Sequence, residues 1–190
     1  MTTTMQLLEA IVGTAEVMGK ELSPVGAQML AQDLSVYSPG AVIQALAKCR
    51  KELRTFPTVA DIVARIDDGR PGPEEAWAMI PKDERQSVVW TEEMAAAFDA
   101  CRHLIGYDLV AARMAFREAY SRELAGARSN ARPVHWSPSL GFDRHGRESV
   151  VLEAVTRGRL TAQHAQELLP DASISPRILA LISGATKRLT

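Results

Sequence analysis

The sequence predicts an all-α fold, and three observations support that prediction. Apolar residues recur at spacings of three and four along most of the chain, side-chain acceptors stand just before several of these segments, and no stretch shows the sustained alternation of a β-strand. We expect a compact helical amino-terminal domain, then a helix pair, then a carboxy-terminal region of short helices. Their expected ranges are 1–88, 89–126 and 127–190.

The first helices are predicted by apolar spacing and by two Ser-Pro pairs. Ser23-Pro24 and Ser38-Pro39 each place a side-chain acceptor at the N-cap and a proline at the first helical position, where its missing N–H costs nothing. Helices are therefore expected to begin near residues 24 and 39. The residues expected to face the core are Met5, Leu8, Val12 and Ala15 in the first helix, and Val42, Leu46, Cys49 and Leu53 in the third.

Further helix starts follow in the middle of the chain. Thr58 and Asp61 have the spacing of a capping box, and residues 67–73 then break the chain before Pro73 starts a short helix. Thr91, followed by two glutamates, starts a helix that runs to about His103. The residues expected to anchor these helices are Val59, Ile62, Val63 and Ile66 in the first, and Trp77 and Ile80 in the second.

The second half begins with the strongest helix of the chain. Its apolar stripe is expected to comprise Leu109, Ala112, Phe116, Tyr120 and Leu124. Residues 126–147 are rich in glycine and proline and are expected to form a linker or a partly packed segment. Short helices are expected near 147–157, 161–168 and 175–186.

Composition limits the class of protein. The 190 residues include 22 basic and 23 acidic side chains, and a net charge of −1 excludes a polybasic protein that holds nucleic acid by bulk charge. The charge is uneven, −6 over residues 1–99 and +5 over residues 100–190, which indicates either different partners for the two halves, mutual attraction or chance. Two cysteines outside any CxxC, no basic leader and no apolar run of about 18 residues favour a cytoplasmic protein without a membrane partner.

The chain lacks the motifs of common catalytic sites. Residues 13–21 resemble a P-loop but have one residue too many between the glycines, and Glu21 stands where the Mg²⁺-binding Ser or Thr belongs. His135 and His145 flank a loop, but two histidines without a nearby carboxylate or thiol are short of a zinc site. We therefore expect no catalytic residues, no metal and no cofactor.

The remaining candidate site is a basic and aromatic one. Arg113 and Arg117 share a helix face, and Arg132 and Trp136 follow in the adjoining loop. Guanidinium groups beside an exposed aromatic ring suit single-stranded DNA, because they contact the backbone while the ring stacks on a base. The alternative is that nearby glutamates neutralise this face and that Trp136 packs on the domain.

One segment resembles a known family. The residues concerned are Ser38-Pro39, Ala45-Leu46, Arg50 and the run Phe56-Pro57-Thr58-Val59-Ala60-Asp61-Ile62. This segment is similar to small helical phage replication proteins that load the replicative helicase, including the loader-and-inhibitor type, whose amino-terminal helical domain ends in a similar turn and helix. In this motif Phe56 anchors the turn, Pro57 ends the preceding helix, Thr58 caps the next one and Ile62 returns to the core.

The resemblance implies a function in DNA replication and a ring-shaped helicase as partner. In the resembling family the carboxy-terminal part engages the helicase, and residues from Trp136 onward match no such motif. The first hypothesis is therefore a non-enzymatic, phage- or prophage-encoded adaptor that loads or inhibits the host helicase. The alternatives are a nucleic-acid-binding accessory or regulatory factor without a helicase partner, and a virion or host-takeover protein whose helices form an interaction surface.

Overall fold

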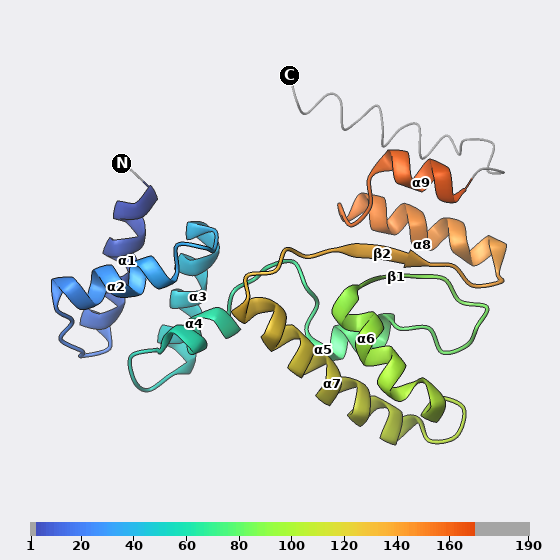
Figure 1. Ribbon diagram of the computed structural model, residues 1–190, viewed down its shortest axis with the longest axis horizontal. Coiled ribbons are helices and arrows are strands. Elements are labelled where there is room, and N and C mark those ends of the chain that lie inside the picture. The colour runs from blue at the N-terminus through green and yellow to red at the C-terminus, as the bar shows by residue number, and fades with distance from the viewer. Residues whose placement is uncertain (1–2, 170–190) are drawn as a thin grey trace. The chain divides into compact units, whose positions relative to one another are not determined.

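The computed structural model describes residues 3–169, and most of them are helical (Figure 1). This confirms the predicted all-α-dominated fold. The chain divides into two compact units. Unit 1 combines the residues up to Arg70 with Arg122–Val134, and unit 2 combines Pro71–Ser121 with the residues from His135 onward. The predicted segments 1–88, 89–126 and 127–190 group the residues differently, because packing brings chain segments together that are distant in sequence.

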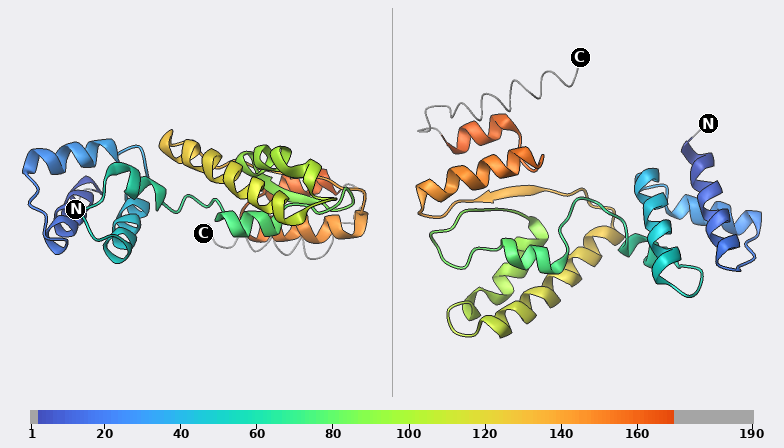
Figure 2. Two further views of the ribbon diagram at one scale, coloured as in Figure 1. Left: turned by 90° about the horizontal axis from the view of Figure 1, so that it is seen from below. Right: turned by 180° about the vertical axis from the view of Figure 1, so that it is seen from behind.

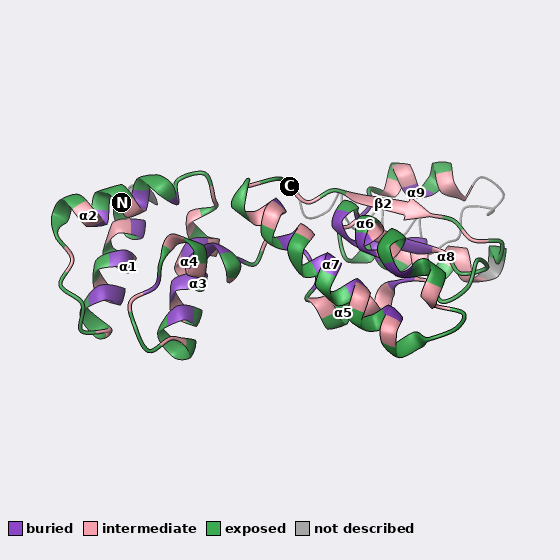
Figure 3. Ribbon diagram, turned by 60° about the horizontal axis from the view of Figure 1, so that its bottom comes forward, coloured by how far each residue is buried: buried purple, intermediate pink, exposed green. Residues whose placement is uncertain are grey.

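Unit 1 is built on four helices. Helix α1 packs against α2 and α3, and α3 packs against α4. Most of the buried residues of these helices, purple on the ribbon in Figure 3, form one apolar cluster. The helices are α1 (Thr3–Val17), α2 (Pro24–Asp33), α3 (Pro39–Glu52) and α4 (Val59–Ala64), and the cluster includes Leu7, Ile11, Leu34, Val42, Leu46, Cys49 and Ile62.

The predicted core face of α1 is partly wrong. Met5 and Val12 are about half exposed, whereas Leu7 and Ile11 are buried. Apolar residues occupy two neighbouring faces of this helix, so the spacing alone does not select one of them. Packing against α2 and α3 decides which face is buried.

Most of the predicted helix starts are confirmed. The Ser23 hydroxyl accepts the backbone N–H of Gly26 in α2, and Thr58 and Asp61 form the complete capping box of α4. In unit 2, the Thr91 hydroxyl accepts the backbone N–H of Met94 at the start of the helix Glu92–Cys101. Ser38 starts α3 without a side-chain cap bond. The prediction that Pro57 ends α3 is wrong, because the helix already ends at Glu52.

Unit 2 places helices on both sides of a short antiparallel ladder. Strand β1 pairs with β2, with Val88 opposite Ser139 and Thr91 opposite Trp136. Helices α5 and α6 lie on one side of this ladder, and α8 and α9 lie on the other (Figures 1 and 2). The elements are α5 (Pro73–Met79), β1 (Val88–Thr91), α6 (Glu92–Cys101), the 3₁₀ turn η1 (Arg102–Leu104), α7 (Leu109–Ser129, which continues into unit 1), β2 (Trp136–Ser139), α8 (Arg144–Thr156) and α9 (Ala162–Leu168).

The two strands correct the expectation that the chain has none. Val88, Val89 and Thr91 are all buried, and β1 contacts both α6 and α8. A strand covered on both faces shows no alternation of apolar and polar residues, and four residues are too few to show a period.

The later helices follow the apolar pattern closely. In α7 the side chains of Ala112, Phe116, Tyr120 and Leu124 are buried, whereas Leu109 is 53% exposed. Helices α8 and α9 form near the predicted ranges 147–157 and 161–168. The helix expected at 175–186 lies outside the described residues.

Candidate functional site

The turn-and-helix motif at residues 56–62 has a structural role in unit 1. Phe56 packs against the core, Pro57 is buried and Ile62 is fully buried. The carboxylate of Asp61 accepts bonds from the hydroxyl (2.6 Å) and the backbone N–H (2.9 Å) of Thr58, and these bonds lower the pKa of Asp61. The motif residues therefore stabilise the turn.

Arg113 and Arg117, two of the predicted nucleic-acid contacts, share one carboxylate in unit 2. Their guanidinium groups lie 2.5 and 2.7 Å from the Glu74 carboxylate of α5, and all three side chains are about half exposed. The Arg113 hydrogen bond and the charges of both arginines lower the pKa of Glu74. The two arginines thus share one face, as predicted, and one acidic group partly neutralises it.

Trp136, the predicted base-stacking platform, is partly buried in unit 2. It packs against the apolar cluster that includes Val89, Val151 and Leu160. The Arg159 guanidinium lies over its ring, 4.3 Å from the centroid. A cation in this position occupies the ring face that a base would need.

Arg132 belongs to unit 1, whereas the other three candidates belong to unit 2. The described part of unit 2 contains 9 basic and 13 acidic residues, a net charge of −4, and unit 1 contains 10 and 9, a net charge of +1. The strongly acidic first half and strongly basic second half therefore do not correspond to the two units, of which unit 1 is almost neutral and unit 2 is acidic. The acidic residues 71–99 fold with the basic start of α7, as the Glu74 contacts show.

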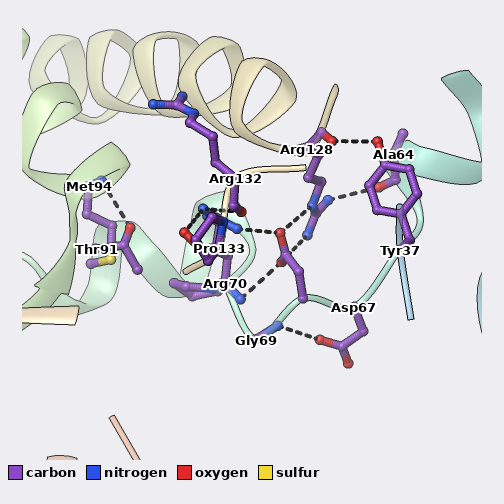
Figure 4. Close-up of polar contacts among 12 residues, drawn as sticks. Tyr37, Ala64, Asp67, Gly69, Arg70, Thr91, Met94, Arg128, Arg132 and Pro133 are labelled. Carbon is purple, nitrogen blue, oxygen red and sulfur yellow. Dashed lines mark hydrogen bonds and ion pairs between the residues drawn. The ribbon is translucent and has the colours of Figure 1, made fainter. Parts of the chain in front are cut away.

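A cluster that we call the polar junction (Tyr37, Asp68, Arg70 and Arg128) lies in unit 1 (Figure 4). The Asp68 carboxylate lies 2.7 Å from the Arg70 guanidinium and 3.3 Å from that of Arg128. The Arg70 side chain is only 1% exposed. Burial by itself raises the pKa of Asp68, but the bonds and charges of the two arginines outweigh it and the pKa is lowered.

The polar junction also binds backbone carbonyls from distant segments. Arg70 donates to the carbonyls of Arg132 (3.2 Å) and Pro133 (3.1 Å), and Arg128 donates to that of Ala64 (2.9 Å). The Tyr37 hydroxyl donates to the Arg128 carbonyl at 2.8 Å (Figure 4). These bonds attach residues 122–134 to the first four helices, so the junction stabilises unit 1.

Four exposed apolar side chains of unit 2 lie around the start of α7, and Phe142, in another loop of the unit, is also exposed. The α7 apolar surface consists of Tyr107, Leu109, Val110 and Met114, which are 94%, 53%, 72% and 66% exposed. Val110 and Met114 are four residues apart and point away from the buried stripe of the same helix. Contiguous apolar side chains in water are typical of protein-interaction sites.

A pocket lies beside this surface. Ile105 and Gly106 form part of its wall and directly precede Tyr107 in the chain. We call it the Trp90 pocket. Its volume is about 710 Å³, and its lining includes Trp90, Phe98, Ile105, Leu140, Arg102 and His103. The Trp90 and Phe98 rings pack at a tilt, with centroids 5.3 Å apart.

The sequence reasoning missed both features. Val110 and Met114 were visible as an apolar pair outside the predicted stripe of α7, so a second apolar face could have been noticed. No sequence pattern predicts the Trp90 pocket, because its walls combine residues from three separate stretches of the chain, 81–86, 90–106 and 139–141.

No protein-family model, curated protein or solved structure matches this chain. Among the described residues, no helix is long and apolar enough to cross a membrane. Within the same described residues, there is no group of three or more His, Cys, Asp or Glu side chains that could hold a metal ion.

Proposed function

We propose that the protein is a non-enzymatic adaptor of DNA replication that binds the host's ring-shaped replicative helicase and loads or inhibits it. The observation that supports the adaptor function is the α7 apolar surface. Its four large apolar side chains are 53–94% exposed to solvent, and exposed apolar surfaces of this kind are typical of protein-interaction sites. The identity of the partner rests on the resemblance of residues 38–62 to phage helicase loaders.

The adaptor would act through differential affinity. A ligand shifts an equilibrium between two ring conformations only by the difference in its affinity for them. Tighter binding to an open ring would favour loading onto DNA, and tighter binding to an inactive ring would favour inhibition. Neither outcome requires catalysis by the adaptor itself.

The test is a binding and unwinding experiment with the full chain. The host helicase is mixed with the protein at micromolar concentration, and size-exclusion chromatography with light scattering measures the mass of any complex. Unwinding of a forked DNA is then measured with and without the protein. The proposal predicts a complex and a changed unwinding rate; two independent species in the column would overturn it.

The alternative function, binding of single-stranded DNA through Arg113, Arg117, Arg132 and Trp136, has less support. The four residues are divided between the units, the arginines of unit 2 contact Glu74, and Arg159 covers Trp136. A fluorescence titration with labelled single-stranded DNA at two salt concentrations discriminates the hypotheses. The alternative predicts a steep decrease of affinity with salt, whereas the adaptor hypothesis predicts no binding by this protein alone.

A further inference from the structure

One side of α1 in unit 1 carries apolar and acidic side chains in a single exposed row. We call this row the α1 outer face, and it consists of Met5, Glu9, Val12 and Glu16. The four residues follow one another at spacings of four, three and four, so they lie along the same side of the helix. The opposite side, which includes Leu7, Ile11 and Thr14, is buried. The α1 outer face extends over about three helical turns, or about 17 Å.

The α1 outer face ends in an open hollow at the turn between α1 and α2. Val12 and Glu16 line one part of this hollow and residues 19–22 line another, and its volume is about 470 Å³. Gly19 has a φ of 67°, which reverses the chain without adding a side chain to the hollow. The hollow therefore gives an apolar side chain of a partner a place beside Val12 and Leu22.

Negative charge dominates this part of unit 1. Residues 3–37 contain one basic residue, Lys20, and four acidic residues, a net charge of −3. The four acidic side chains are Glu9, Glu16, Glu21 and Asp33, and all of them are exposed. None of the four forms an ion pair with another described residue.

The basic residues of the neighbouring helix α3 leave this excess in place. Arg50 is the α3 arginine that reaches α1, and its guanidinium donates to the Thr14 hydroxyl at 2.6 Å. Thr14 is fully buried and lies on the side of α1 opposite to the α1 outer face. The carboxylates of the α1 outer face therefore keep their charges free for a partner.

We propose that the α1 outer face binds a basic, amphipathic helix of a partner protein. The apolar side chains of that helix pack against Met5 and Val12, and its Lys or Arg side chains pair with Glu9, Glu16 and Glu21. Apolar contact supplies affinity, and the carboxylates select a partner of opposite charge. This inference goes beyond the proposed function, because it concerns unit 1 and requires neither a helicase nor the α7 apolar surface.

The test uses two synthetic peptides of about 16 residues, long enough to form a helix on binding. Both present Leu at i, i+3, i+4 and i+7, and they differ only in having Lys or Glu on the flanks. Fluorescence anisotropy measures their affinity for the full chain without any helicase, so the result does not depend on the proposed function. We expect the Lys peptide to bind about tenfold more tightly, and this preference to shrink with added salt. Equal affinities, or a preference for the Glu peptide, would overturn the inference.

A matched pair of double variants tests the carboxylates. Glu9→Gln with Glu16→Gln removes two charges from the α1 outer face and should weaken the Lys peptide about tenfold. Glu92→Gln with Asp99→Asn is the control, since these exposed residues of α6 have the same spacing of seven. The control should bind the Lys peptide as the wild type does. Equal weakening in the two variants would mean that overall charge attracts the peptide, and would overturn the inference.

A second pair tests the apolar contact. Met5→Gln with Val12→Gln replaces two half-exposed side chains of α1 and should also weaken the Lys peptide about tenfold, with circular dichroism checking that the fold is kept. Val110→Gln with Met114→Gln makes the same replacement on α7 and should have no effect. Loss of binding in the α7 variant but not in the α1 variant would contradict the proposal.

The other occupant of an exposed helix face is a second copy of this chain. Two α1 outer faces would bring like charges together, which disfavours such a dimer. Light scattering of the protein alone should therefore give the mass of a monomer. A dimer that Met5→Gln with Val12→Gln converts to a monomer would show that the face binds its own copy, and would overturn the inference.

Discussion

Unit 1 and unit 2 each place two arginines against one carboxylate, but in different environments. In unit 1, Asp68 contacts Arg70 and Arg128, whose side chains are only 1% and 16% exposed. In unit 2, Glu74 contacts Arg113 and Arg117 where all three side chains are about half exposed. The same chemistry therefore contributes to stability in unit 1 and leaves charges open to solvent and partners in unit 2.

The sharpest test of this comparison removes each carboxylate's charge in turn. Asp68→Asn should destabilise unit 1 by about 3 kcal/mol, because it removes the negative charge that lies 2.7 Å from the buried Arg70 guanidinium. Glu74→Gln, the matched control in unit 2, should leave the unfolding midpoint almost unchanged. Urea unfolding with hydrogen exchange read separately for the two units measures both effects. Equal losses in the two variants would contradict the comparison.

The pH dependence has a definite sign. The pKa of Asp68 is lowered from its ordinary value of 3.8, so the stabilisation by its carboxylate is present above that value and is lost as the pH falls below it. Hydrogen exchange should therefore accelerate in unit 1 of the wild type at acid pH. In Asp68→Asn this contribution should be missing at every pH.

The two units differ in the space available around a glycine. In unit 2 a Cβ on Gly141 would collide with the backbone of Arg85 and Gln86, whereas a Cβ on Gly126, in the unit 1 part of α7, meets nothing. Gly141→Ala should destabilise unit 2 by about 2 kcal/mol, because the loop beside the Trp90 pocket must move. Gly126→Ala should stabilise by about 0.5–1 kcal/mol, since glycine is unfavourable in a helix. Thermal unfolding measures both, and tolerance of Gly141→Ala would show that the loop is loosely held.

Within unit 1, two helix starts differ in their caps. Thr58→Ala removes a complete capping box and should cost about 1 kcal/mol. Ser38→Ala removes a hydroxyl that makes no cap bond and should cost less. Urea unfolding compares the two variants; a larger loss at Ser38 would mean that its hydroxyl caps α3 in solution.

The smallest expected effect concerns the end of α7. Ala131 has a φ of 48°, and its N–H and that of Arg132 bond back to carbonyls of the last helical turn, as in a Schellman motif. Ala131→Gly should stabilise unit 1 by about 0.5–1 kcal/mol, because alanine is strained in the left-handed region. Ala125→Gly is the control and should destabilise the same helix by about 1 kcal/mol. A lower melting temperature for Ala131→Gly would contradict this account.

Part of the fold could be predicted because the signals are local. A cap such as Thr58 acts on a backbone N–H three residues away, so its effect is present in the sequence itself. The buried stripe of Phe116 and Tyr120 is similarly visible, because apolar residues recur along it at spacings of three and four over most of the helix. The helix pattern was therefore largely predictable.

The candidate site could not be predicted in the same way. Arg113 and Arg117 were correctly placed on one face, but their contact with Glu74 depends on the packing of α5 beside α7. Trp136 was visible as an aromatic residue, and only the pairing of β2 with β1 and the position of Arg159 show that its ring is covered.

Helix starts, most of their caps and the dominance of helices follow from local sequence, because these properties depend on neighbours within one or two turns. Long-range packing selects which face of α1 is buried, pairs the two short strands, removes some arginines from water and forms the Trp90 pocket. Those outcomes depend on residues that are distant along the chain, and each side chain's environment exists only once the units have folded.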